Sequence, residues 1–202
     1  MPQETNLPPS RRAVLLAGGA LAAVAWRAML PPAVAAATHT DSETFTQNEI
    51  LQAAEGFFGT VSQALAELIE RVFKEQGRPN GYITGEEASG ALGVGLRYGQ
   101  GRLRLKNGGR RRVFWQGPSI GFDVGGNASK AFTLAYGIRR TEQIFQRFPG
   151  VDGSLYYVAG FSVNYQKSGS ITLAPIRTGV GLRAGVSIGY LHYTREHSWI
   201  PL

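Results

Sequence analysis

The fold is decided by residues 114–138, which read FWQGPSIGFDVGGNASKAFTLAYGI. Large apolar residues in this stretch alternate with glycines and small polar residues, so that one face of an extended chain is apolar. The apolar positions are Ile120, Phe122, Val124, Phe132, Leu134 and Tyr136. Gly126 and Asn127 separate the two apolar runs and predict a turn between two strands. Because glycine lets a strand bend sharply, the stretch predicts a curled antiparallel sheet that forms a small barrel.

Length and composition fit one folded domain. The chain has 202 residues, of which 43% are hydrophobic, and this is enough to build a core. It contains 27 glycines and no cysteine, which excludes disulfides, thiolate metal sites and a cysteine nucleophile. The formal net charge is +7. A basic domain attracts anionic polymers or anionic lipid, although such a charge also serves simply to keep a protein soluble.

The N-terminus has the pattern of an export signal. Arg11 and Arg12 precede an apolar run over residues 13–26, and small residues at 33–37 offer cleavage sites. This run is shorter than the about 20 residues that a membrane-spanning helix needs. The paired arginines are typical of the twin-arginine route, with an ordinary secretory signal or an uncleaved anchor as alternatives. We predict a cleaved signal peptide over residues 1–37, a mature domain over residues 38–202, and a periplasmic location.

A long amphipathic helix is expected after residue 46. Thr46 and Glu49 have the spacing of a capping box, and apolar residues then recur at helical spacing as far as Phe73. Gly56 and Gly59 would each cost about 1 kcal/mol inside a helix, so the pattern also allows a break there. We expect the apolar side of this helix to pack on the sheet.

The rest of the chain predicts short strands and turns. Asn107–Gly108 is the strongest hairpin signal in the sequence, and residues 99–101 and 167–170 predict further turns. Residues 141–148 predict a short second helix. This order of elements predicts a mainly β fold with α: a small antiparallel β-barrel with a long N-terminal amphipathic helix and a short second helix.

One surface carries a binding pattern. Basic residues occupy both arms of the predicted hairpin, and a tryptophan follows them. Guanidinium groups bind phosphates and carboxylates through paired hydrogen bonds, and tryptophan tolerates a half-exposed position. The candidate binding residues are Arg102, Arg104, Lys106, Arg110, Arg111, Arg112 and Trp115. The same charges would also suit a solvated edge hairpin that positive charge protects against aggregation.

The sequence contains no clear catalytic pattern. His192 and His197 are five residues apart and do not share a strand face, and no nucleophile elbow is present. Glu86 and Glu87 would point to opposite faces of a strand, so they favour paired-carboxylate chemistry only if they converge in a loop. An inward-facing Asp123 would need a partner such as arginine or tyrosine. We therefore predict no catalytic site, no metal site and no cofactor.

Several segments resemble the bacterial envelope-integrity (EipA-like) family. They are residues 81–88, 92–96, 117–126, 148–153 and 179–190, among which the Pro-Gly-Val-Asp-Gly run is fairly specific. The resemblance covers most of the mature chain and implies a soluble periplasmic protein with a small β-barrel, needed for envelope integrity and without an assigned catalytic activity. Residues 117–145 are also similar to the SYLF domain. This fainter likeness covers under half of the chain and implies lipid binding.

We expect a non-enzymatic periplasmic protein that supports the integrity of the cell envelope. The predicted partners are anionic lipid, lipopolysaccharide, peptidoglycan or another envelope protein, and nucleic acid is not expected as a partner. The alternatives are an enzyme that acts on cell-wall glycan and an assembly factor that binds only protein. A buried pair of acidic groups that face one cleft would favour the enzyme.

Overall fold

The computed structural model describes residues 43–178 and 189–197, without the side chains of residues 90–94 and 119–128. The predicted signal peptide over residues 1–37 lies outside the described residues, and so does the side chain of Asp123. The division of the chain at residue 37 therefore stays a prediction.

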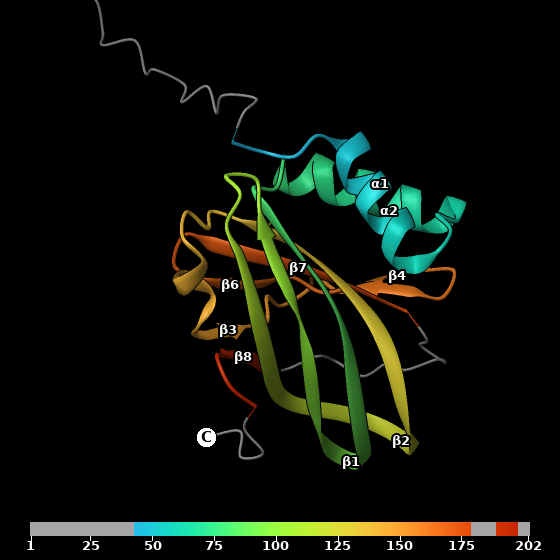
Figure 1. Ribbon diagram of the computed structural model, residues 1–202. Coiled ribbons are helices and arrows are strands. Elements are labelled where there is room, and N and C mark those ends of the chain that lie inside the picture. The colour runs from blue at the N-terminus through green and yellow to red at the C-terminus, as the bar shows by residue number, and fades with distance from the viewer. Residues whose placement is uncertain (1–42, 179–188, 198–202) are drawn as a thin grey trace, which may run out of the picture. The chain divides into compact units, whose positions relative to one another are not determined.

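Two helices precede an antiparallel sheet (Figure 1). The helices are α1 (Gln47–Phe58) and α2 (Gln63–Gln76), and a single 3-10 turn, η1 (Thr141–Ile144), follows the second strand. The strands are β1 (Gly81–Leu105), β2 (Arg110–Tyr136), β3 (Arg147–Pro149), β4 (Tyr156–Val158), β5 (Phe161–Val163), β6 (Gln166–Ser168), β7 (Ile171–Thr178) and β8 (Tyr190–Thr194).

Strand β2 organises the sheet. One edge of β2 pairs with β1 along almost its whole length, while the other edge pairs with β8 near its start and with β7 near its end. Strand β3 pairs with β8, β6 pairs with β7, and an isolated bridge between Gly150 and Gln166 joins these two pairs. All of these pairings are antiparallel. The fold is therefore a mainly antiparallel β half-barrel with two helices, and the predicted barrel-like fold class is confirmed.

The predicted turn at Gly126–Asn127 was wrong. Asn127 pairs with Ser89 inside the continuous β1–β2 ladder, and the register shifts between Ser89 and Ala91. The chain therefore stays in one strand through an irregularity of the ladder. Glycine and asparagine are common in bulges and bends as well as in turns. These residues alone therefore did not distinguish an irregularity within a strand from a chain reversal.

Glycines in β1 lie where the earlier part of this strand, around Gly85, contacts its later part, around Gly101. We call these two parts the arms of β1. A Cβ on Gly101 would lie 2.5 Å from the carbonyl oxygen of Thr84, and a Cβ on Gly85 would lie 2.8 Å from Cα of Gly101. A Cβ on Gly99 would overlap the ring of Trp115. Residues 99–101, which we predicted to form a turn, lie inside β1, so this prediction was wrong. Their glycines leave room for neighbouring backbone and for an indole ring.

The predicted long N-terminal helix is not confirmed, because residues 47–76 form two helices. Thr46 caps α1 in the expected capping box with Glu49. Gly59, at a φ of +96°, ends α1, and its N–H donates to the carbonyl oxygen of Glu55. Ser62 then caps α2. The predicted second helix at residues 141–148 is reduced to η1, and β3 follows it.

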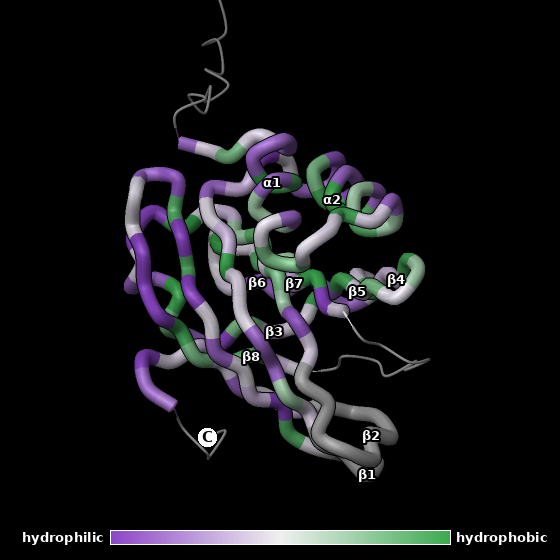
Figure 2. The backbone as a smooth tube through the Cα atoms, turned by 45° about the vertical axis from the view of Figure 1, so that its right-hand side comes forward, coloured by the Kyte–Doolittle hydropathy of each residue, from purple (hydrophilic) through white to green (hydrophobic). Residues whose placement is uncertain are grey.

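The end of β2 is buried on both faces. Phe132 and Leu134 pack under the helices, whereas Ala131 and Ala135 face a second core on the other side of the sheet. The helices contribute Ile50, Ala54, Leu65, Leu68, Ile69 and Val72 to the first core. The predicted packing of an amphipathic helical segment on the sheet is thus confirmed, with α1 and α2 lying together beside β4, β5 and β7 (Figure 2).

Candidate functional site

The arms of the β1–β2 hairpin carry four arginines on one exposed face. In the antiparallel register Arg102 lies opposite Arg112, and Arg104 lies opposite Arg110. All four side chains are exposed. Directly opposed residues of an antiparallel pair project to the same side, where like charges repel each other. We call Arg102, Arg104, Arg110 and Arg112 the outer arginine face.

No carboxylate neutralises the outer arginine face within the part of the chain that the structure describes. The only polar contact recorded there is from Nη2 of Arg112 to Oε1 of Gln100, at 3.1 Å. The guanidinium of Arg112 also lies 5.1 Å from the centre of the Phe114 ring. The face therefore presents concentrated positive charge to solvent, as the sequence predicted for these four residues.

Two other predicted binding residues have different surroundings. Nζ of Lys106 forms an ion pair with Glu49 at 2.5 Å and lies 5.0 Å from the centre of the Phe45 ring, so Lys106 ties the hairpin to the start of α1. Hydrogen bonds from Lys106 and from the Thr46 backbone lower the pKa of Glu49 to about 2. Arg111 lies opposite Leu103, and its guanidinium lies 5.8 Å from the centre of the Phe145 ring. Neither residue belongs to the outer arginine face.

The prediction of a half-exposed Trp115 was wrong. The side chain is 3% exposed and lies in the second core, 5.7 Å from the Tyr193 ring between centroids. Its Nε1 donates a hydrogen bond of 3.0 Å to Oε2 of Glu87. An aromatic residue beside a basic run suggests an interface, but here the alternation of β2 turns the indole inward, where Gly99 leaves space for it.

The hydrogen bond from Trp115 ends at a buried group of charges that the sequence analysis did not identify. Oε1 of Glu87 lies 2.7 Å from Nε of Arg177 and 3.4 Å from Nε of Arg97. Glu87 is 4% exposed. We call Glu87, Arg97 and Arg177 the interior charge cluster. The only signal in the sequence was the alternation that places Glu87 on the same strand face as the buried Ile83.

The interior charge cluster keeps its carboxylate ionised. Burial alone would raise the pKa of Glu87, but the charges of Arg177 and Arg97 and the hydrogen bond from Trp115 outweigh it and lower that pKa below its usual value. Glu86 projects to the opposite, exposed face. The two neighbouring acids therefore do not converge, as their spacing on a strand predicted.

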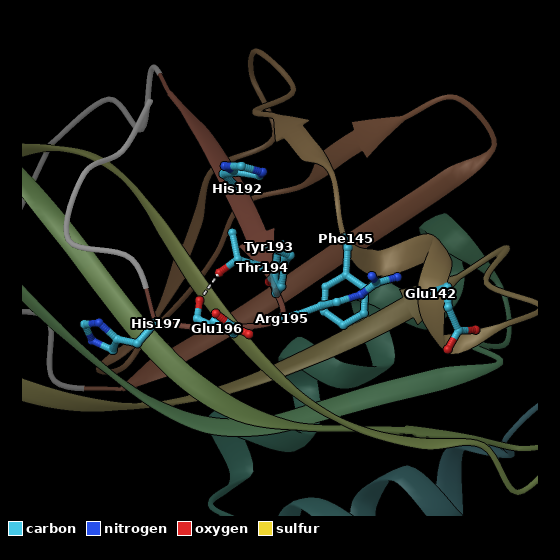
Figure 3. Close-up of a pocket in the computed structure, with 8 residues that line it drawn as sticks. All are labelled: Glu142, Phe145, His192, Tyr193, Thr194, Arg195, Glu196 and His197. Atoms are coloured by element: carbon cyan, nitrogen blue, oxygen red, sulfur yellow. Dashed lines mark hydrogen bonds between the residues drawn. The ribbon is translucent and has the colours of Figure 1, made fainter.

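A separate surface pocket of about 630 Å³ lies between η1 and the end of β8 (Figure 3). Its lining is mostly polar and consists of Glu142, Phe145, His192, Tyr193, Thr194, Arg195, Glu196 and His197. Burial and the charge of Arg147 lower the pKa of His192. Within residues 43–178 and 189–197, no three histidine, aspartate or glutamate side chains are grouped as metal ligands.

The chain is similar to known proteins in both fold and sequence. The solved crystal structure of a β-barrel-like, uncharacterised protein from Brucella abortus is similar to this chain, with a TM-score of 0.71 and 44% sequence identity over 79% of this chain and 99% of that one. The sequence model of envelope integrity protein A matches residues 43–202. This chain belongs to the envelope integrity protein A family, as its sequence resemblance predicted. No curated protein matches it.

Family membership implies a role in the integrity of the cell envelope and suggests an envelope location. The helices in the described part of the chain, α1 and α2, are too short and too polar to span a membrane.

Proposed function

We propose that this protein is a non-enzymatic periplasmic protein that supports the envelope by binding anionic lipid or anionic polysaccharide through the outer arginine face. One observation carries the proposal: on one exposed face of the hairpin, Arg102 lies opposite Arg112 and Arg104 lies opposite Arg110. Opposed like charges cost stability in a sheet, and an anionic ligand that lies across the face would remove this repulsion.

The chemistry of the face fits phosphate and carboxylate groups. Each guanidinium presents a rigid fork of donors that matches an oxyanion, and strands lie about 5 Å apart, so the four forks form a compact array. Such an array suits a ligand with several anionic groups close together, like the surface of an anionic bilayer or an anionic glycan. Binding through exposed charges weakens as salt concentration rises.

The enzymatic alternative finds little support in the carboxylates that the structure describes. A glycan hydrolase needs a general acid whose pKa is raised. Glu87 has a lowered pKa and is surrounded by arginines. In the surface pocket, hydrogen bonds from its own backbone and from Thr141 lower the pKa of Glu142. The alternative of a purely protein-binding assembly factor differs from our proposal in predicting no response to anionic lipid.

The test is sedimentation of residues 38–202 with vesicles of anionic phosphatidylglycerol and of neutral phosphatidylcholine. We expect binding to the anionic vesicles only, and at least a tenfold loss when the outer arginine face is changed to serine, since each charged contact contributes about 1 kcal/mol near a membrane surface. A matched control removes four exposed positive charges elsewhere: Lys74, Arg140, Arg147 and Lys167. Equal loss in both variants, or no binding to either vesicle, would overturn the proposal.

A further inference from the structure

We infer that the surface pocket between η1 and the end of β8 binds an uncharged saccharide. Its volume of about 630 Å³ lies within the range of roughly 300–1,000 Å³ that is typical of small-molecule sites. The lining combines exposed charged side chains of both signs with an aromatic ring (Figure 3). Such a lining suits a ligand that has both hydroxyl groups and an apolar face.

The charged side chains of the lining are not neutralised by one another. Glu142, Arg195 and Glu196 are exposed, and none of them forms an ion pair within residues 43–178 and 189–197. The carboxylate of Glu142 accepts a hydrogen bond of 3.0 Å from the hydroxyl of its neighbour Thr141. Most of the hydrogen-bonding capacity of these three groups is therefore available to a ligand.

Two negative and two positive side chains surround the pocket. The carboxylates of Glu142 and Glu196 oppose the guanidinium groups of Arg195 and of Arg111, which reaches this side of the molecule from the hairpin. The pKa of Glu142 is lowered by hydrogen bonds from its own backbone and from Thr141, and then by the charges of Arg111 and Arg195. The carboxylates would repel a free phosphate, and the guanidinium groups would repel an ammonium ion. A hydroxyl group avoids both penalties, because it donates to a carboxylate and accepts from a guanidinium.

Phe145 gives the pocket an apolar surface and positions its guanidinium groups. The guanidinium carbon of Arg195 lies 5.0 Å from the centre of the Phe145 ring, and that of Arg111 lies 5.8 Å from it. A guanidinium that rests on an aromatic ring keeps its N–H groups, which lie in its own plane, free for acceptors. The uncovered part of the half-buried ring attracts the slightly positive C–H groups of a sugar, because the face of a π-system is negative.

The walls of the pocket are held in place by the fold. The N–H of Tyr193 donates to the carbonyl oxygen of Gln146 at 3.0 Å, which joins the chain after η1 to β8. The ring centre of Tyr193 lies 5.7 Å from that of Trp115 in the second core. The hydroxyl of Thr194 donates to the carbonyl oxygen of Glu196 at 2.7 Å (Figure 3). A preformed site has little conformational entropy to lose on binding, which favours weakly bound ligands such as sugars.

The saccharide site is separate from the outer arginine face and does not depend on the function proposed above. Arg111 alternates with Arg110 and Arg112 along β2, so it projects to the opposite face of the hairpin. The two sites also differ in their response to salt. Salt screens the contact between exposed charges and an anionic surface, whereas the hydrogen bonds to an uncharged sugar involve no charge on the ligand.

The experiment follows probe binding to the protein, expressed as the full chain, by proton–nitrogen correlation NMR. The saccharide probes are maltotriose and triacetylchitotriose, with inorganic phosphate as an anionic probe and glycine as a zwitterionic one. We expect at least one trisaccharide to shift the amide signals of Phe145, Thr194 and Arg195 until they saturate, and to do so equally at low and at high sodium chloride. Phosphate and glycine should leave these signals in place.

A charge-removal variant tests the site against a matched control. Glu142→Ala/Arg195→Ala/Glu196→Ala should weaken trisaccharide binding at least tenfold. All three side chains are exposed, so the variant should keep the melting temperature of the wild type. The control makes the same change at two glutamates and one arginine that are exposed outside the pocket, and it should bind like the wild type: Glu55, Glu67 and Arg104.

Three results would overturn the inference. The first is a wild-type protein in which neither trisaccharide shifts the signals of the pocket. The second is binding of phosphate or glycine in the pocket where the trisaccharides fail to bind. The third is a pocket variant that binds trisaccharide as tightly as the control variant does, since the sugar would then contact another part of the protein.

Discussion

Replacement of Gly85 by alanine should destabilise the fold, because two arms of β1 meet at this residue. A Cβ at position 85 would lie 2.7 Å from Cη2 of Trp115 and 2.8 Å from Cα of Gly101, and closer still to the carbonyl oxygen of Gln100. Two of these three neighbours are backbone atoms, which cannot rotate away. Overpacking of a core costs about 1–3 kcal/mol, and fixed backbone neighbours favour the upper end of that range.

The matched control is Gly56→Ala in α1. Gly56 is exposed, lies within the helix, and has nothing within 4 Å of an added Cβ. Alanine is favoured over glycine in a helix interior by roughly 0.5–1 kcal/mol, so this variant should be more stable than the wild type. The same chemical change therefore has opposite expected signs at the two positions.

Thermal and urea unfolding followed by circular dichroism measure both variants. For a domain of this size, 1 kcal/mol corresponds to about 2–4 °C in melting temperature. We expect a decrease of roughly 6–12 °C for Gly85→Ala and an increase of about 2 °C for Gly56→Ala. If Gly85→Ala unfolded within 1 °C of the wild type, the two arms of β1 could not be in contact at this residue.

Two further predictions concern carboxylates. The folded pKa of Glu87 lies below its unfolded value of about 4.3, so its contribution is complete above that pH and is lost as pH falls through the folded pKa. The free energy of unfolding is measured in urea from pH 7 to 3 for the wild type and for Glu87→Gln. It should fall less on acidification in the variant than in the wild type. An equal fall in both proteins would contradict the ion pairs of Glu87. Lys106→Gln should raise the pKa of Glu49 from about 2 part of the way toward 4.5. NMR titration of the side-chain carboxyl group of Glu49 measures this pKa. An unchanged pKa would show that Lys106 does not bind Glu49.

Local signals in the sequence predicted the features that depend on neighbouring residues. Asn107 and Gly108 form the hairpin turn, in which Gly108 has a φ of +91° and the Asn107 side chain accepts from the N–H of Gly109. Thr46 and Glu49 form the capping box in the same way. In each case the side chain bonds to backbone within three residues, so the residue types alone determine the geometry.

The same reasoning failed where a glycine responds to a distant part of the chain. Gly85 and Gly101 are sixteen positions apart, and their lack of side chains is explained only by the contact between the arms of β1. The alternation of side chains along a strand has the same period of two residues whether the chain continues straight or reverses direction. It therefore does not show where the chain turns. Without knowledge of the contact, a glycine beside a polar residue indicates a turn, and this produced the errors at residues 99–101 and 126–127.

The two sets of arginines show the same limit for the site. The outer arginine face lies within residues 102–112, so the clustering of charge in the sequence was enough to identify it. Glu87 and Arg177 are ninety positions apart, and only the folded sheet brings them within 2.7 Å. The difference in burial also separates their chemistry. Exposed charges are screened over about 8–10 Å at physiological salt, while buried charges are screened much less. The outer face can therefore serve the reversible contact with an anionic surface that we propose, whereas the buried ion pairs of Glu87 respond little to salt.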